Sequence, residues 1–390
     1  MKRFIMTAAL LCGIGASCAI AQEDFRFNTI TAHPITSIKN QNQTGTCWCF
    51  STISFLESEL MRMGKGEHDL CEMFVVGKTM LDRARTVVDS NGKEVFYQGG
   101  SHYDVMYCLK NYGLCPQSAM PEPGSLYGET LPVHNELDAL AAAYVEARTS
   151  RSATEGNENW LVGLKGIYEA YIGKMPERFT IKGVEHTPVS YAKSLGLNAD
   201  DYVSLTSYTH HPFYEKFALE VSDNWRRDLS WNLPLEELLR VFDNAIDNGY
   251  TIAWSADVSE PGKTDKGLML CPDKKALKEA DGPGKVSLAT IYDISGRDFK
   301  YPVNEIRIDQ KIRQKGFDKG ETTDDHAMHI FGKAKDQGGK DYFMVKNSWG
   351  TEIGRDGIWY ASRAYIAYKT MNIVVHKDAI PADIRAKLGI

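Results

Sequence analysis

The sequence predicts an α+β protein with two lobes, one mainly helical and one built on antiparallel β-strands. Two observations carry this prediction. Apolar residues recur at helical spacing through most of the chain before Tyr250, whereas short runs rich in β-branched and aromatic residues follow it. The length of 390 residues is enough for such a fold with an insertion. We expect a helical lobe over about 22–125, a helical insertion over about 126–248 and a β-rich lobe over about 249–390.

The composition is that of an ordinary soluble globular protein. Hydrophobic residues make up 43% and charged residues 25% of the chain, which excludes a disordered, collagen-like or multi-span membrane protein. The net charge of −6 comes without a basic stripe, so we expect no nucleic-acid partner. No internal repeat is visible, which argues against a solenoid or propeller.

The first segment is predicted to be a secretory signal peptide. Residues 1–21 start with two positive charges, continue with an apolar stretch and end in a small-x-small pattern at Ala21. We therefore expect a protein exported from a bacterial cell, to the periplasm or the outside, with no membrane span. Two alternatives stay open: a lipid anchor at Cys18, although no Leu stands three residues before it, and an uncleaved anchor.

Helices are predicted through the first half of the chain. The first starts at Cys47, just after Gly45, and carries an apolar stripe with steps of four and three up to Met63. Further helices are expected over Leu70–Asp82 and Tyr103–Tyr112. The Ala-, Leu- and Glu-rich text over Asn135–Ile172 predicts more helix.

A last helix is expected from Pro234 to Ile246, since proline favours the first turn. The pattern then changes to strands. These are predicted at Tyr250–Trp254, Ala327–Phe331, Tyr342–Lys346, Ile358–Tyr360 and Asn372–Val375.

Three residues predict nucleophilic catalysis. Cys47 stands at a helix N-terminus, where free N–H groups and the helix dipole favour an anion, so we expect a lowered pKa and a reactive thiolate. His326 can hold that thiolate as an ion pair and then protonate a leaving amine. Asn347 can orient the imidazole through its side-chain oxygen.

These motifs resemble those of the papain-like cysteine peptidases. The segment GTCWCFS around Cys47 is similar to the nucleophile motif of that family, and Gln41 stands at the place of its oxyanion-hole glutamine. His326-Ala and Asn347-Ser-Trp-Gly match the other two catalytic motifs, in the same order. The resemblance implies a two-lobed papain-like fold and peptide hydrolysis by a Cys-His-Asn triad, with no cofactor and no metal.

Four further residues take roles from the same resemblance. Gly99 and Gly100 stand where the family pairs cleft glycines with the substrate main chain, and glycine allows that close approach. Trp48 and Trp349 are expected to support the site, Trp349 as a cover over the His–Asn pair, with a plain core tryptophan as the alternative. Gln41 would join the Cys47 N–H on the tetrahedral oxygen.

Within the family, the chain looks most like the bleomycin hydrolase and aminopeptidase C branch. The residues on which this resemblance rests include His326-Ala327-Met328 and Asp257-Val258. That branch uses a long C-terminal arm to capture the amino terminus of the substrate, and the arm looks short here. An aminopeptidase is therefore the first expectation and an endopeptidase the alternative, and a homo-oligomer stays open.

Several motifs have simpler interpretations. Cys47 and Cys49 do not form a redox or metal pair, because residues two apart on a helix point away from each other. His210-His211 is taken as a surface loop, since no carboxylate or cysteine is spaced to join it as a metal ligand. His329 is expected to be a structural histidine. Cys108–Cys115 is a conceivable disulfide, although six cysteines after residue 21 do not make a disulfide scaffold.

Two other functions remain as hypotheses. A non-catalytic protein of the same fold would bind peptides or a partner, but the complete set of catalytic residue types argues against it. Acyl transfer to an amine rather than to water would use the same triad.

Overall fold

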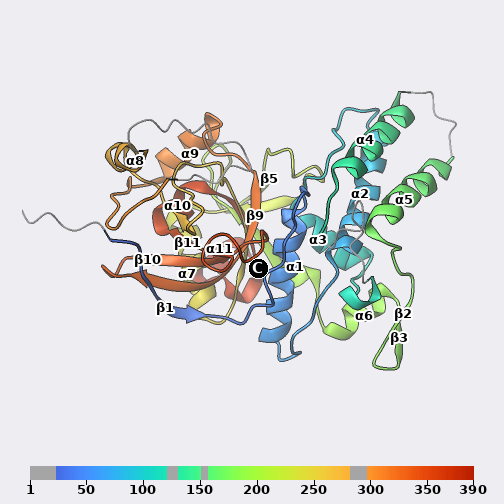
Figure 1. Ribbon diagram of the computed structural model, residues 1–390, viewed down its shortest axis with the longest axis horizontal. Helices are drawn as coiled ribbons and strands as arrows, with labels where there is room; N and C mark the ends of the chain where they lie inside the picture. The colour runs from blue at the N-terminus through green and yellow to red at the C-terminus, as the bar shows by residue number, and fades with distance from the viewer. Residues whose placement is uncertain (1–22, 121–130, 151–156, 282–296) are drawn as a thin grey trace, which may run out of the picture.

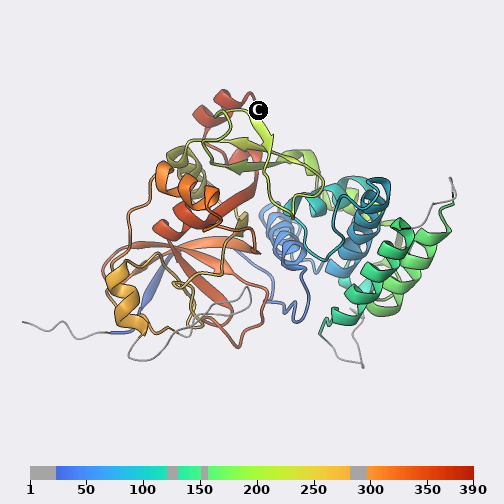
Figure 2. The same ribbon diagram turned by 90° about the horizontal axis from the view of Figure 1, so that it is seen from above.

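A computed structural model describes residues 23–120, 131–150, 157–281 and 297–390, and the predicted signal peptide lies outside them. The helices between residues 72 and 195 gather on one side of the molecule, the large sheet with the later helices lies on the other, and α1 lies between them (Figures 1 and 2). The expected α+β class is confirmed. The described helices are α1 (Cys47–Arg62), α2 (Glu72–Asp89), α3 (His102–Asn111), α4 (Asn135–Thr149), α5 (Asn159–Ile172), α6 (Pro188–Leu195), α7 (Leu235–Asp247), α8 (Lys274–Asp281), α9 (Gln310–Asp318), α10 (Arg363–Lys369) and α11 (Ala382–Leu388).

The sheet contains ten strands in the order β5-β6-β4-β12-β7-β9-β10-β11-β8, and β1 pairs with β9. Its strands are β1 (Phe27–Ala32), β4 (Tyr202–Thr206), β5 (Lys216–Ala218), β6 (Leu229–Asn232), β7 (Ile252–Ala256), β8 (Leu268–Met269), β9 (His326–Asp336), β10 (Asp341–Lys346), β11 (Ile358–Ser362) and β12 (Thr370–His376). A separate hairpin joins β2 (Phe179–Ile181) to β3 (Val184–His186). The pairs β4–β6 and β8–β11 are parallel, so the sheet is mixed rather than purely antiparallel.

The predicted helical insertion is helical only in its first part. It contains α4, α5 and α6, but β4, β5 and β6 belong to the large sheet and α7 packs on that sheet. Periodicity did not reveal these strands because they are only three to five residues long. The boundaries of the three segments stay a prediction.

Helix α1 is buried on every side rather than along one stripe. Each residue from Trp48 to Leu60 is buried, because the helix packs against α2 and α3 on one side and against β7 and β9 on the other. Its acidic side chains are paired inside: Glu57 accepts hydrogen bonds from Thr36 Oγ1 (2.5 Å) and the Leu70 N–H (2.9 Å). The first turn has no side-chain cap; the N–H groups of Cys49 and Phe50 bond to the Thr46 carbonyl, and those of Cys47 and Trp48 have no intrahelical carbonyl acceptor.

The segment around Glu72 fastens the N-terminal chain to this core. Lys39 Nζ lies 2.7 Å from Glu72 Oε1 and 2.7 Å from Asp69 Oδ1. Lys346 Nζ donates to Thr36 Oγ1 at 3.0 Å from the opposite lobe. These contacts hold the loop that carries Gln41 against both lobes.

No described helix is long and apolar enough to cross a membrane.

Candidate active site

The predicted catalytic residues come together where the two lobes meet. Cys47 is the first residue of α1, His326 is the first residue of β9, and Asn347 directly follows β10. A cavity of about 410 Å³ is lined by Cys47, His326 and Gln41, among others. The backbone N–H of Ala327 hydrogen-bonds to the Cys47 sulfur, so the thiol lies next to the start of β9.

Asn347 fixes the tautomer of His326. His326 Nε2 lies 2.7 Å from Asn347 Oδ1, and the Ser348 N–H donates to the same oxygen at 2.8 Å. Since the second contact requires an acceptor there, the Asn347 oxygen faces the imidazole and His326 Nε2 is the donor. His326 Nδ1 is then left as the proton acceptor of the neutral ring.

The amide of Gln41 is oriented from both ends. Its Nε2 donates to the Thr44 carbonyl at 2.8 Å, and its Oε1 accepts from Ser348 Oγ at 2.6 Å. The side chain is 3% exposed. Two N–H bonds are available on Nε2, so one remains for a ligand in the cavity after Thr44 has taken the other.

The expected low pKa of Cys47 is not found in the substrate-free site. Burial raises the pKa of Cys47 to about 12, although the N–H groups of Ala327 and Trp48 act against this. Burial also lowers the pKa of His326 to about 3, against the hydrogen bond that its Nε2 donates to Asn347 Oδ1. Burial therefore opposes the helix N-terminus at Cys47 and disfavours the charged form of each group taken alone.

Moving the proton from Cys47 to His326 changes this balance. Ionising either group alone is costly because each is withdrawn from water. Proton transfer creates the two charges side by side, and their attraction offsets part of that cost. The arrangement is thus that of a thiol and its general base.

The two glycines have different surroundings. Gly99 lines the cavity, whereas Gly100 is buried and does not. A Cβ on Gly100 would lie 2.9 Å from the Trp48 ring and 2.9 Å from Asp104 Oδ2, so close packing requires glycine there. Trp48 Nε1 donates to the Gln98 carbonyl at 3.0 Å and holds this segment beside α1.

The ring of Trp349 lies against that of His326, at the place predicted for a cover over the His–Asn pair. Its ring centroid lies 4.6 Å from that of His326, and the side chain is half-buried. Sequence reasoning missed Lys263, whose Nζ lies 3.8 Å from the centroid of the Trp349 ring. Burial lowers the pKa of Lys263 to about 7, against the attraction of Asp325. A lone lysine in a loop carries no sequence signal for this position.

Four aspartates of the cavity wall were also missed. Asp138, Asp223, Asp324 and Asp325 line the cavity, and no lysine or arginine of the described chain does. Burial raises the pKa of Asp138 and of Asp325 to about 7. Asp324 and Asp325 directly precede His326, which is the one signal that placed them near the site.

His329, in contrast, lies away from the cavity. Its Nδ1 is 3.0 Å from Ser54 Oγ, the side chain is fully buried, and Nε2 has no partner among the described residues. The structural role predicted for it is compatible with this position.

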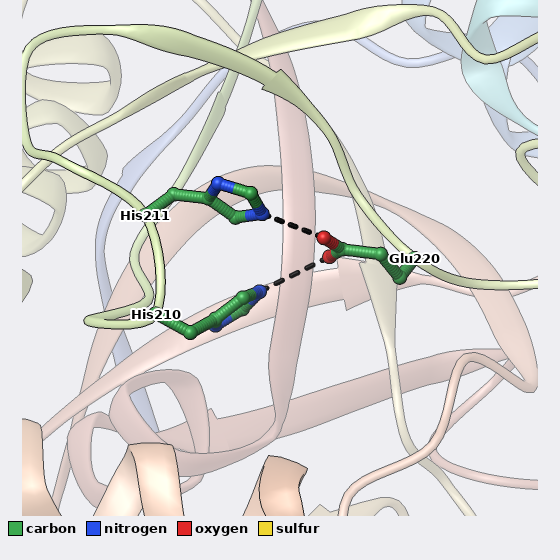
Figure 3. Close-up of side chains that lie close together, drawn as sticks. All are labelled: His210, His211 and Glu220. Atoms are coloured by element: carbon green, nitrogen blue, oxygen red, sulfur yellow. Dashed lines mark hydrogen bonds and ion pairs between the residues drawn. The ribbon is translucent and has the colours of Figure 1, made fainter.

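The His210-His211 pair does meet a carboxylate, contrary to expectation. Glu220 lies 3.0 Å from His210 Nε2 and 2.6 Å from His211 Nε2, and both rings point toward it (Figure 3). The loop that follows β5 brings Glu220 back to the pair, which chain spacing alone did not indicate.

The hydrogen bonds around these three residues do not suit a metal ion. Gln314 Oε1 accepts from the Thr209 N–H at 2.5 Å, so its Nε2 is the group that faces His210 Nδ1 at 3.1 Å. A donor opposite Nδ1 places the proton of neutral His210 on Nε2, where it bonds to Glu220. A metal needs that nitrogen lone pair.

The conceivable Cys108–Cys115 bridge is absent, and the six described cysteines are all free. Cys108 Sγ donates to the Gly113 carbonyl at 3.6 Å. The thiol of Cys115 instead hydrogen-bonds with that of Cys71, whose backbone N–H donates to the Cys115 carbonyl at 3.0 Å.

Comparison with known families agrees with this geometry. Residues 22–116, which contain Gln41 and Cys47, match the papain family of cysteine proteases. Residues 299–389, which contain His326 and Asn347, match the Peptidase C1-like family.

Similar proteins cover nearly the whole chain. The chain is 23% identical to aminopeptidase G of Lactobacillus delbrueckii subsp. lactis, over 90% of its length and 84% of the relative. It is 21% identical to aminopeptidase C of Listeria monocytogenes, over 95% of its length and 88% of the relative. The crystal structure of PepW from Lactobacillus rhamnosis has the same fold, with a TM-score of 0.70, 18% identity, and coverage of 93% of this chain and 84% of that one.

The site geometry, the two family matches and the shared fold lead to one conclusion. The segments that carry Gln41, Cys47, His326 and Asn347 match papain-like cysteine peptidase families, and the chain is similar over nearly its whole length to aminopeptidases G and C.

Proposed function

We propose that the protein is an exported aminopeptidase that hydrolyses peptides with Cys47 as nucleophile, His326 as base and acid, and Asn347 as the residue that orients His326. The observation that carries this proposal is the chain of contacts from Asn347 Oδ1 to His326 Nε2, with Cys47 in the same cavity. The names of the relatives support removal of residues from the amino end.

In the first half-reaction, the Cys47 sulfur forms a bond to the carbonyl carbon while its proton moves to His326 Nδ1. The oxygen gains a negative charge and is held by the Cys47 N–H and by the free N–H of Gln41. His326 then gives the proton to the leaving amine as the C–N bond breaks. A thioester on Cys47 and a shortened peptide result.

In the second half-reaction, water attacks the thioester carbon and His326 takes its proton. The C–S bond breaks, the proton returns to Cys47 and the released residue leaves as a carboxylic acid. Gly99 offers its backbone to the bound substrate, and Trp349 shields the His326–Asn347 hydrogen bond from water.

A pair of variants tests the proposal. Cys47→Ala is expected to lower hydrolysis of an unblocked tripeptide by at least about 1,000-fold, because the covalent step is lost. Cys49→Ala is the matched control, since Cys49 is a thiol of the same helix that is buried and does not line the cavity. Retained activity in Cys47→Ala, or an equal loss in both variants, would contradict the proposal.

Export is tested by the mass of the protein made in a bacterial host. Cleavage after Ala21 predicts a mature chain that starts at Gln22 and is found outside the cytoplasm. A full-length cytoplasmic chain, or a lipid-modified Cys18, would contradict this part of the proposal.

A further inference from the structure

The loop between β5 and β6, residues 219–228, reaches from the sheet to the helical side. Arg226 Nε donates to Asp104 Oδ1 of α3 at 2.7 Å, and its Nη2 donates to Asp82 Oδ2 of α2 at 2.9 Å. The guanidinium of Arg226 also lies over the buried ring of Trp225, 4.2 Å from its centroid. Because Arg226 is largely withdrawn from solvent and meets two carboxylates, the loop is held firmly across the junction of the lobes.

This loop places Asp223 against the glycine that faces the substrate. Asp223 Oδ1 accepts a hydrogen bond from the Tyr97 hydroxyl at 2.7 Å. The same oxygen is so close to Gly99 that a Cβ there would lie 2.3 Å from it. A peptide main chain that runs along Gly99 therefore meets a carboxylate and the wall formed by the loop.

Asp324 adds a second carboxylate, and unlike Asp223, on which Arg83 acts, it has no cationic neighbour among the described residues. It lines the same cavity, and no described residue donates a hydrogen bond or forms an ion pair to it. Its charged neighbours are Asp223 and Asp325, and with burial they raise its pKa well above the usual range. Asp223 and Asp324 both raise the pKa of Cys47, so both carboxylates lie within electrostatic reach of its sulfur.

Among the described residues no lysine or arginine lines the cavity, although the charge of Arg83 acts on Asp223 from outside the lining. The C-terminal helix α11 does not contribute either. It packs on α7, with Arg240 paired to Asp383 at 2.8 Å and Lys387 paired to Glu237, and none of its residues lines the cavity.

We infer that Asp223 and Asp324 bind the α-ammonium group of the substrate, and that the β5–β6 loop blocks any longer chain beyond it. The inference rests on the proposed function, which supplies the ligand: a peptide bound for removal of its first residue. A free amino terminus would supply Asp324 with the cationic partner that no described residue provides. An acetylated terminus brings no charge and adds bulk against Asp223.

The test compares one peptide amide substrate in two forms, with a free and with an acetylated amino terminus. Wild type is expected to prefer the free form by at least about 100-fold. Asp324→Asn and Asp223→Asn are each expected to lower kcat/KM for the free form by at least about tenfold, mainly through KM, because a charge-assisted contact to the ammonium is lost. The acetylated form is expected to change less than about twofold.

Asp228→Asn is the matched control. It removes the same charge from the same loop, its carboxylate does not line the cavity, and Oδ2 has no hydrogen-bond partner to lose. This variant should keep the wild-type preference for the free form. Alkylation of Cys47 in all three variants shows that the site is still assembled.

Three outcomes would overturn the inference. One is unchanged preference in Asp223→Asn and Asp324→Asn. Another is an equal loss for both substrate forms, which indicates a structural role. The third is Asp324-dependent cleavage of an acetylated lysyl substrate, which would assign the carboxylates to a side-chain ammonium. Hydrolysis that needs Cys47 but ignores both aspartates refutes this inference alone, whereas hydrolysis that persists in Cys47→Ala refutes the proposed function.

Discussion

Ser348→Ala is expected to slow catalysis although Ser348 does not line the cavity. Its hydroxyl donates to Gln41 Oε1 at 2.6 Å, and both side chains are buried. Without this hydrogen bond the amide of Gln41 is held only through the Thr44 carbonyl. Ser348 is thus a positioning residue that acts through Gln41.

The magnitude follows from two limits. The net value of one buried hydrogen bond is about 0.5–1.5 kcal/mol, which corresponds to about 2- to 13-fold in rate. Complete loss of one oxyanion donor costs about 100- to 1,000-fold in kcat. Because Thr44 still holds the amide, we expect a fall in kcat of about tenfold. The unpaired Gln41 oxygen should also lower the free energy of unfolding by about 1–3 kcal/mol.

The assay is a double-mutant cycle with Gln41→Ala. We expect Ser348→Ala to lower kcat in the wild-type background with little change in KM, and to have almost no further effect on kcat when Gln41 is already absent. Ser348→Thr keeps the hydroxyl and should restore most of the rate.

Equal effects of Ser348→Ala in both backgrounds would refute the reasoning, since Ser348 would then act by another route. An effect on KM alone would also refute it, because the oxyanion forms only in the transition state.

Four further predictions concern ionisable and thiol groups. In His326→Gln, alkylation of Cys47 should be at least about 100-fold slower than in wild type at pH 6. Its rate should rise about tenfold per pH unit between pH 6 and 9, because burial raises the pKa of the thiol to about 12. A plateau of the rate near neutral pH would contradict this, since the helix N-terminus alone would then stabilise the thiolate. Lys263→Met should raise the pKa of His326 and move the acid limb of kcat/KM to higher pH, since the charge of Lys263 lowers that pKa. The pKa of Lys263 in the folded protein, about 7, lies below its value in the unfolded chain. The charged lysine therefore destabilises the fold fully below pH 7, and this effect disappears as the pH rises toward 10.5. Lys263→Met should gain more stability against urea at pH 7 than at pH 10, and an equal gain at both would contradict this. Under mild oxidation by a disulfide reagent, mass mapping should find Cys71 joined to Cys115, and a Cys108–Cys115 product would contradict the contact seen here.

The grouping of Cys47, His326 and Asn347 in one site was predictable because each carries a local signal. Cys47 follows Gly45 at the start of an apolar helix, and the residues around His326 and Asn347 form recognisable motifs. The lengths of the long helices followed from periodicity, although α2 continues to Asp89, beyond the predicted end at Asp82, and stops at the Asn91-Gly92 turn.

The walls of the cavity were not predictable in the same way. Asp223 reaches the site on a loop between two short strands, and Asp138 reaches it from α4. Such residues are placed by tertiary connections, for which one sequence has no periodic signal. The expectation of a low pKa for Cys47 overlooked a similar tertiary effect. The helix terminus is visible in the sequence, but the burial that raises the pKa of the thiol is not.

The most direct test of the proposed activity is a paired peptide digest followed by mass spectrometry. One set of peptides has free amino termini and the other is the same set after acetylation, and each is treated with wild type and with Cys47→Ala. We expect wild type to release single residues from the free set only, and Cys47→Ala to release none. Internal cleavage of both sets, or equal products from the two proteins, would contradict an aminopeptidase that depends on Cys47.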